Sequence, residues 1–499
     1  MMKKYVLIFI GFVLIGIIYF AISTSQSSQK FPPPEGFPVL ENGKLVIDKK
    51  PFFPITINYI LTLQADKDKF WITPFGGYYP ENKHRFISKD SCLMELEAEF
   101  KLIKEMGFNS VRIVRVGEVG IEDKATGRLS IGARINNEKD TTLMLWNDKN
   151  YDVYFDALED LFQLANKTGL KIIYLVRLSA DAPGTEVCLE KLTQRFKNEK
   201  AILAYDFFNE PLYFDTVERD KEDVYQIVKR WNKIVKKNAP NQLTTIGLAG
   251  IREVFEWDPN ILDVDFISLH PYEYEPDQVR NELYWYGKYI KKPWLIGETA
   301  ISADNDSVSY LDQLAFAEKT IKQTYNCGSI GYSWWQFKDV DWKLFHANFM
   351  GVINWAGETV VPGSKVTVKG TVKPVVQAFQ KFNPNLPKGE CLCASNYYNY
   401  SNGKECRLKG KLIDENGNPI EGGLVLAWNE WWSSSYHTVS KKDGTFELLG
   451  TFPFYHWMAS ATEFSRVRGE LKPDTAKAVF DSIPTMNIGN LNLNALKLY

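Results

Sequence analysis

The alternation of strand and helix patterns between residues 37 and 384 is the feature that most constrains the fold. Short apolar segments suited to buried parallel strands recur there, and segments with apolar residues at helical spacing separate them. About eight such units favour an α/β fold with a closed (β/α)8 barrel, the TIM barrel, over an open doubly wound sheet. No Gly-x-Gly-x-x-Gly follows the first strand, which argues against a dinucleotide-binding domain. The expected strands are 55–60, 110–114, 171–176, 204–208, 243–247, 265–269, 294–296 and 329–333.

The composition changes after the barrel pattern. Residues 385–407 are predicted to be a linker, and residues 408–499 contain short strand patterns separated by Gly- and Asn-rich turns. This predicts a C-terminal all-β sandwich domain.

The N-terminus carries an export signal. Lys3 and Lys4 precede an apolar run from residue 5 to residue 22, which predicts a signal peptide or an N-terminal membrane anchor over residues 1–23. Residues 24–36 are polar and then proline-rich, as in a spacer. With the lysines on the cytoplasmic side, we expect the rest of the chain to be extracytoplasmic, secreted or membrane-anchored.

The composition restricts partners and metal sites. A formal net charge of −2 over 499 residues provides no basic field for nucleic acid. The 14 Trp, 25 Tyr and 31 Phe suit either core packing or a surface that stacks on sugar rings, and both interpretations stay open. Among six cysteines, a disulfide is expected between Cys406 and either Cys391 or Cys393. Cys92, Cys188 and Cys327 are expected to be small buried residues. Cys391, Cys393 and Cys406 lie close together in the sequence, but no histidines stand near them at zinc-ligand spacing, so no metal site is predicted.

Two glutamates end expected barrel strands. Glu210 follows the strand that begins at Ala204, and Glu298 follows the strand 294–296. The carboxyl ends of barrel strands meet at one mouth, where ligands bind. Two carboxyls about 5–5.5 Å apart define a retaining glycosidase, in which one attacks the anomeric carbon and the other protonates the leaving oxygen. This chemistry requires no cofactor.

These residues carry a family resemblance over roughly residues 37–384. Asn209-Glu210-Pro211 closing the fourth strand, Glu298 closing the seventh, and Gly107-Phe-Asn-Ser-Val-Arg-Ile113 at the second together resemble clan A of the retaining glycoside hydrolases, nearest to the family-5 cellulase and mannanase group. The resemblance implies Glu210 as general acid/base and Glu298 as nucleophile. It implies an oligo- or polysaccharide substrate, of β-linked glucan or mannan type.

The resemblance also implies substrate-binding residues at the same mouth. Asn209 would donate to the sugar 2-hydroxyl, and Arg112 would keep Glu298 ionised and oriented. His270 would line the sugar site, Tyr272 would hold Glu298, and Trp335 would form the floor beneath the sugar. The neighbouring Trp334 is expected to point the other way and pack. Further subsites could involve tryptophans in expected loops: Trp71, Trp146, Trp342 and Trp355.

Two departures from the family leave the substrate open. Many members carry a histidine soon after the third strand, where this chain has Arg177. The insertion 117–148 is long and is expected to turn an open groove into a pocket. The C-terminal domain resembles the carboxypeptidase regulatory-like sandwich, and its tryptophans suit either carbohydrate binding or packing against the barrel: Trp428, Trp431 and Trp432.

Other functions remain as alternatives. A transglycosylase would use the same site, and a catalytically silent carbohydrate-binding protein of the cell surface would keep the fold. A serine hydrolase is disfavoured, because no Gly-x-Ser-x-Gly elbow is present. The chain is expected to be a monomer.

Overall fold

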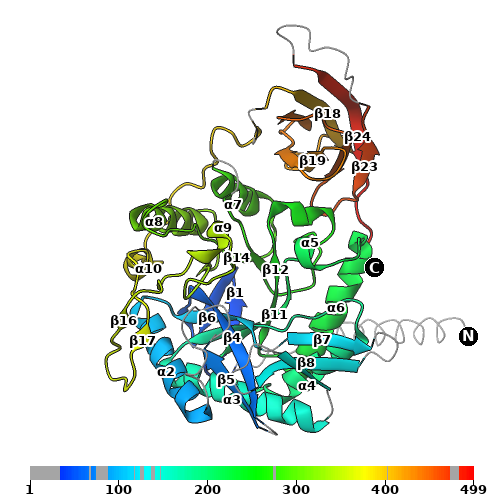
Figure 1. Ribbon diagram of the computed structural model, residues 1–499. Helices are drawn as coiled ribbons and strands as arrows, with labels where there is room; N and C mark the ends of the chain where they lie inside the picture. Colours follow the sequence, from blue (N-terminus) through cyan, green and yellow to red (C-terminus); the bar gives the residue numbers. More distant parts are fainter. Residues whose placement is uncertain are drawn as a thin grey trace, which may run out of the picture.

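The computed structural model describes residues 34–66, 69–74, 88–116, 118–123, 128–135, 141–145, 148–273, 277–399, 401, 403–472 and 483–498 (Figure 1). In these ranges no helix is long and apolar enough to cross a membrane. The predicted signal peptide or anchor, residues 1–23, lies outside the described residues.

Eight parallel strands form a closed barrel, as the alternating pattern predicts. The barrel closes where the last strand pairs with the first, with Tyr332 opposite Ile55. Each strand is buried on both faces by the barrel interior and the surrounding helices, which explains its apolar sequence. The strands are β4 (Ile55–Asp66), β6 (Ser110–Arg115), β10 (Lys171–Leu175), β11 (Ile202–Asn209), β12 (Leu243–Leu248), β13 (Ile267–Leu269), β14 (Trp294–Ile296) and β15 (Tyr332–Trp334).

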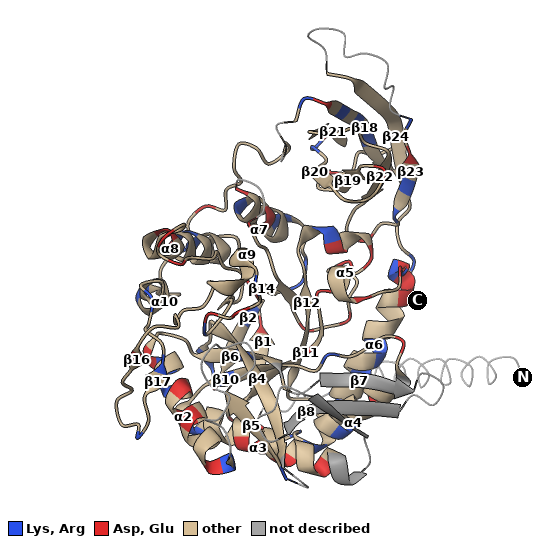
Figure 2. Cartoon of the chain, in the orientation of Figure 1, with Lys and Arg blue, Asp and Glu red and all other residues tan. Residues whose placement is uncertain are grey.

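Helices surround the barrel (Figure 1). In α6 (Lys221–Asn238) the buried residues Val224, Val228 and Val235 recur at helical spacing, so one apolar stripe faces the strands. Acidic and basic residues are interspersed on the outer helices (Figure 2). The remaining helices are α2 (Lys89–Glu105), α3 (Asp148–Thr168), α4 (Pro183–Arg195), α5 (Pro211–Phe214), the 3₁₀ helix η1 (Ile251–Phe255), α7 (Gln278–Tyr289), α8 (Tyr310–Asn326), α9 (Phe345–Asn348) and α10 (Val376–Lys381).

An N-terminal hairpin covers one end of the barrel. β1 (Pro38–Glu41) and β2 (Lys44–Ile47) pair around Asn42 and Gly43, which both have positive φ, as a two-residue hairpin turn requires. Leu45 of β2 packs with residues from the first halves of the barrel strands, among them Ile173 and Leu203. The hairpin and the short β3 (Lys50–Pro51) therefore close the N-terminal end, and the carboxyl end is the mouth.

Additional strands extend the sheet beyond the barrel. β5 (Lys69–Pro74) pairs with the outer half of β4. The predicted insertion contributes β7 (Glu118–Asp123), β8 (Arg128–Ile135) and β9 (Thr141–Leu145), and β8 pairs with β4. The side chains of residues 117–148 are outside the described set, so their effect on the cleft stays a prediction. A two-stranded ribbon, β16 (Glu358–Thr359) and β17 (Val368–Lys369), precedes α10.

Two C-terminal sheets face each other, as expected for a β-sandwich. One contains β18 (Cys406–Asp414), β21 (Thr445–Gly450) and β24 (Thr485–Leu493). The other contains β19 (Leu424–Trp428), β20 (Ser435–Val439), β22 (His456–Ser460) and β23 (Val467–Glu470). Leu412 and Phe446 pack between the sheets with Ala459. Leu424, Leu426 and Trp428 instead join the core cluster of the barrel, so the second sheet is docked on the barrel.

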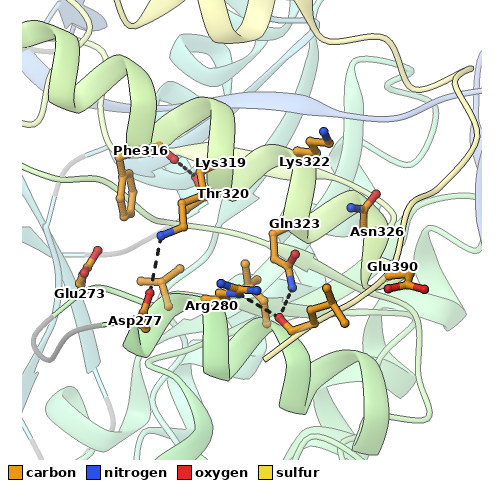
Figure 3. Close-up of a pocket in the computed structure, with 13 residues that line it drawn as sticks. Glu273, Asp277, Arg280, Phe316, Lys319, Thr320, Lys322, Gln323, Asn326 and Glu390 are labelled. Carbon is orange, nitrogen blue, oxygen red and sulfur yellow. Dashed lines mark hydrogen bonds and ion pairs between the residues drawn. The ribbon is translucent and has the colours of Figure 1, made fainter. Parts of the chain in front are cut away.

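The expected linker is fastened to the barrel, and the expected disulfide pairing is wrong. Cys391 is bonded to Cys327, which directly follows α8, whereas Cys393 and Cys406 are free thiols. Cys406 is buried in the sandwich core, where neither of its predicted partners lies. The backbone oxygen of Leu392 accepts hydrogen bonds from Arg280 and Gln323, at 3.1 and 2.8 Å (Figure 3). These residues border a cavity of about 300 Å³ between α7, α8 and the linker.

We expect the linker bridge to stabilise the fold. The Cys327–Cys391 bond closes a loop with a sequence separation of 64 residues. Without the bond the unfolded chain gains conformational entropy, so Cys391→Ser should lower the free energy of unfolding by about 2–4 kcal/mol. Cys393→Ser is the matched control, because Cys393 lies two residues away and is unbonded. Urea titration under non-reducing conditions measures both. Equal stability of Cys391→Ser and the wild type would contradict the assigned bridge.

Candidate active site

The two predicted glutamates lie at the barrel mouth. Glu210 directly follows β11, adopts a left-handed backbone with φ +51°, and precedes Pro211, where α5 begins. A non-glycine residue rarely adopts this conformation, which is characteristic of functional sites. The Glu210 amide donates to Gly247 O on β12 at 2.7 Å, which fixes the turn. Glu298 follows β14 and is 4% exposed.

Arg112 is the centre of a buried polar network. Its guanidinium, fully buried on β6, donates from Nη1 to Glu298 Oε1 at 2.5 Å and from Nε to Asp206 Oδ2 at 2.8 Å. Nη2 donates to Asn209 Oδ1 at 2.8 Å, and Nη1 also to Asn58 Oδ1 at 3.0 Å. The planar guanidinium can serve these diverging acceptors, which an ammonium group could not. Because Asn209 accepts through Oδ1, its amide NH₂ group is oriented away from Arg112.

Glu298 accepts hydrogen bonds on both carboxylate oxygens. Tyr272 Oη donates to Oε2 at 2.8 Å, opposite the Arg112 bond to Oε1. Burial raises the pKa of Glu298 overall, and the charge of Arg112 and the Tyr272 hydrogen bond offset only part of this rise. Since both donors bind the charged form, the site favours the carboxylate over what burial alone would allow.

Glu210 has a different environment. Burial raises its pKa to about 7, and the charge of Arg112 only partly offsets this effect. Glu210 Oε1 lies 2.9 Å from Nδ1 of His270, whose ring is fully buried. Burial lowers the pKa of His270 to about 4, so the imidazole is neutral at pH 7. The two carboxyls at one mouth therefore have different partners: Arg112 and Tyr272 contact Glu298, whereas the neutral imidazole of His270 contacts Glu210.

The reacting groups are close together. One side-chain ligand atom from each of Glu210, His270 and Glu298 lies within 4.8 Å of the other two. At least one oxygen of each carboxyl therefore lies within 4.8 Å of the other, a proximity that suits the retaining mechanism, in which the carboxyls are roughly 5–5.5 Å apart. The same spacing would suit a divalent cation, but the Arg112 guanidinium already neutralises Glu298 and places a positive charge against that position.

Glycines make room for this arrangement. A Cβ on Gly297 would lie 1.9 Å from Ser268 Oγ and 2.7 Å from His270 Nε2, and one on Gly247 would lie 2.7 Å from His270 Cε1. Any larger residue would displace the imidazole from Glu210.

A cavity of about 1030 Å³ opens over the two acids. Asn209, Tyr272 and the half-buried Trp335 line it, as predicted, whereas Trp334 is fully buried in the core. Trp342 also lines the cavity, with its ring centroid 6.1 Å from that of Trp335. Arg177 lies at the wall, so the departure after the third strand reaches the cavity.

The other predicted tryptophans contribute differently. Trp71 is buried beside Cys92 and is not a subsite residue. Trp355 packs on Phe349 and donates from Nε1 to Asp339 O, away from the cavity walls. Trp146 lies outside the described residues.

Sequence reasoning missed the polar residues that hold the site from behind. Asn58 on β4 donates from Nδ2 to Gly297 O and Trp334 O, at 2.8 and 3.0 Å. Asp206 on β11 pairs with Arg112 and accepts from Gly247 N at 3.1 Å. Asn58 and Asp206 are polar residues within largely apolar strands. Because a buried polar group needs a partner, their positions in the sequence could have indicated a polar network inside the barrel.

Glu253 on η1 was also missed. It is 2% exposed, and its Oε1 accepts from the amides of Leu212 and Ala249, each at 3.0 Å. It thereby joins α5, which begins directly after Glu210, to the loop after β12. Burial raises its pKa to about 8.

We expect Glu253→Ala to lower the free energy of unfolding by about 1–3 kcal/mol, because the amides of Leu212 and Ala249 lose their buried acceptor. Glu253→Gln keeps an acceptor oxygen and should stay close to the wild type. Urea titrations at pH 7 compare the three proteins. Equal losses in both variants would contradict the role of Glu253 as a hydrogen-bond acceptor for these two amides.

The fold and the site define a (β/α)8 barrel with two carboxyl groups beside one cavity at its mouth. The family model "Cellulase (glycosyl hydrolase family 5)" matches residues 79–339, just over half of the chain. The chain therefore belongs to glycoside hydrolase family 5.

Solved structures resemble the chain at low identity. A β-glucuronidase from Ruminococcus gnavus is 14% identical, with a TM-score of 0.44, over 69% of this chain and 51% of the other. GH5_18 from Streptomyces cattleya, in complex with Manb1-4GlcNAc, is 13% identical, with a TM-score of 0.45, over 73% and 85%. The chain spans about half the length of the first of these. A comparison with curated proteins gave no match.

Proposed function

We propose that this enzyme is a retaining β-glycosidase in which Glu298 is the nucleophile and Glu210 the general acid/base. The observation that carries the proposal is a pair of carboxyls that each have an oxygen within 4.8 Å of the other. Glu298 is paired with a guanidinium, and burial raises the pKa of Glu210 to about 7. We propose a β-linked glucan or mannan type of substrate, on the family resemblance.

The first chemical step forms a covalent glycosyl-enzyme. Glu298 attacks the anomeric carbon while Glu210 gives its proton to the departing glycosidic oxygen. Arg112 and Tyr272 hold the attacking carboxylate and keep it charged until the bond forms.

The second step releases the sugar. Glu210, now a carboxylate, removes a proton from a water molecule, which attacks the anomeric carbon and returns the electron pair to Glu298. Two inversions give overall retention of configuration. The oriented NH₂ group of Asn209 is suited to bind the sugar 2-hydroxyl, and the Trp335 ring to pack beneath the sugar.

Hydrolysis of a panel of aryl β-glycosides and soluble β-glycans tests this function. We expect release of aryl alcohol or reducing sugar from at least the glucosides or mannosides. Sugar binding without any turnover would instead favour a silent carbohydrate-binding protein.

The pH profile should report Glu210. A pKa raised to about 7 leaves the carboxyl protonated below that pH and ionised above it. We therefore expect kcat/KM for nitrophenyl or alkyl β-glycosides to fall about tenfold per pH unit above pH 7. A dinitrophenyl glycoside, whose leaving group needs no proton, is the matched control and should show no such fall. The same alkaline fall with both substrates would contradict the assignment of Glu210 as the acid.

We also propose that the enzyme acts outside the cytoplasm. The lysines and apolar run at the N-terminus support export, and the Cys327–Cys391 disulfide suits an oxidising compartment. Fractionation of cells expressing the full chain tests this, and recovery of all protein in the cytosol would refute it.

A further inference from the structure

The sandwich exposes two neighbouring tryptophans. Trp431 is 79% and Trp432 is 52% exposed, and both lie in the loop 429–434 between β19 and β20. Large aromatic side chains this exposed on a soluble domain commonly mark a binding surface.

The loop is held in a defined shape. The side chain of Asn429 donates to Ser433 Oγ at 2.7 Å and accepts from Ser433 N at 3.0 Å. The Trp432 ring lies 4.1 Å, centroid to centroid, from that of Trp428, which in turn stacks on His456 at 5.5 Å. The Trp432 ring is thus supported by Trp428, which reduces the entropy lost when a ligand stacks on Trp432.

The course of β19 brings this loop to the level of the barrel mouth. β19 starts beside the C-terminal end of α7, where Trp285 Nε1 donates to Gly422 O at 2.9 Å. A helix that follows a barrel strand returns from the mouth, so this end is remote from the active site. Residues 422–428 extend about 20 Å as a strand, similar to the roughly 18 Å length of α7 as a helix. Trp428 ends β19 and lies at the far end of the strand from this contact, and Figure 1 shows β19 above α5 and α7.

Contacts at η1 confirm this placement. η1 follows β12 at the mouth, and both β19 and β22 contact it. Arg252 of η1 donates to the Tyr213 hydroxyl at 3.1 Å. Tyr213 belongs to α5, whose next residue, Phe214, lines the cavity over the acids.

Exposed apolar side chains therefore run from the cavity to the sandwich. On α5, Leu212, Tyr213 and Phe214 are 41%, 51% and 56% exposed. Within the part of the chain that the structure describes, these side chains keep this exposure. It is explained if a ligand that enters the cavity continues across α5.

We propose that Trp431 and Trp432 form a carbohydrate-binding surface that continues the catalytic cavity across α5, so that the substrate is an extended β-glycan. This inference rests on the proposed function for its substrate class. Flat rings stack on the C–H faces of pyranose units, while Asn429 and the neighbouring serines offer hydrogen bonds to hydroxyls. Its continuity with a sugar-binding cavity favours a glycan over a protein partner.

Two readouts on the full chain test the proposal. In affinity electrophoresis through gels that contain mixed-linkage β-glucan, galactomannan or xyloglucan, we expect at least one glycan to retard the wild type. Trp431→Ala and Trp432→Ala should weaken that retardation severalfold, and Trp431→Tyr should retain most of it. The exposed, remote Leu386→Ala is the matched control and should behave as wild type.

Kinetics with polymer and aryl glycoside form the second readout. We expect kcat/KM on the retarding polymer to fall about tenfold in the tryptophan variants, with the aryl glycoside rate within twofold of wild type. If the wild type hydrolyses both substrates and the tryptophan variants match it in polymer kinetics and retardation, the proposed binding surface is wrong and the proposed function stands. Absence of all hydrolysis by the wild type would refute the proposed function. Electrophoresis would then test the surface alone: weaker retardation of the tryptophan variants would support it, and unchanged retardation would refute it. Light scattering that shows a dimer lost in Trp431→Ala would assign the patch to self-association and overturn the proposal.

Discussion

Glu298→Ala is expected to lower kcat for aryl β-glycosides by at least about a thousandfold, equivalent to roughly 4 kcal/mol in the activation barrier. Alanine leaves no nucleophile on the face of the sugar opposite the leaving group, although Glu210 can still donate its proton. The variant also removes a buried carboxylate from beside Arg112, so circular dichroism should first establish that the barrel is folded.

Azide distinguishes a lost nucleophile from a damaged site. It fits the space of the missing carboxylate, so with a dinitrophenyl glycoside we expect it to restore turnover and give a glycosyl azide of inverted configuration. Glu210→Ala is the matched control, because azide there replaces the base that acts on the glycosyl-enzyme and gives a retained product. Full activity of Glu298→Ala without azide would refute the nucleophile assignment.

Arg112→Met should produce the largest loss of stability, about 3–5 kcal/mol in the free energy of unfolding. Methionine approximates the length of the side chain but leaves Asp206 and Glu298 as buried, uncompensated carboxylates. Asn58 and Asn209 lose a donor at the same time. Urea titration at pH 7 measures the loss.

The matched control is Arg195→Met. Arg195 pairs with Asp156 and Glu159 on the surface and is 39% exposed, so its pairs are screened by water and should contribute less than about 1 kcal/mol. Similar losses for the two variants would show that the Arg112 network is not a buried charge cluster of the kind described.

The barrel and its acids could be predicted because their signals are local. Each strand is a short apolar run, and each glutamate follows directly on one, so the chain order alone places Glu210 and Glu298 at the same edge. The opposite orientations of Trp334 and Trp335 follow from the alternation of side chains along a strand.

The residues behind the site depend on packing that no local pattern specifies. Asn58 and Asp206 became interpretable only when β4, β6 and β11 brought them to Arg112. The disulfide was mispredicted for the same reason, because cysteines close in sequence were paired while the linker in fact lies along α8. Trp71 was expected in a loop, but β5 pairs with β4 and buries it.

The stereochemistry of hydrolysis tests the two-glutamate mechanism most directly. Proton NMR of a β-glycoside digest, recorded before mutarotation, shows which anomer of the sugar is released first. Carboxyls this close leave no room for a water molecule behind the anomeric carbon, so the account predicts the β-anomer. Initial release of the α-anomer would mean direct attack by water and would contradict the role of Glu298.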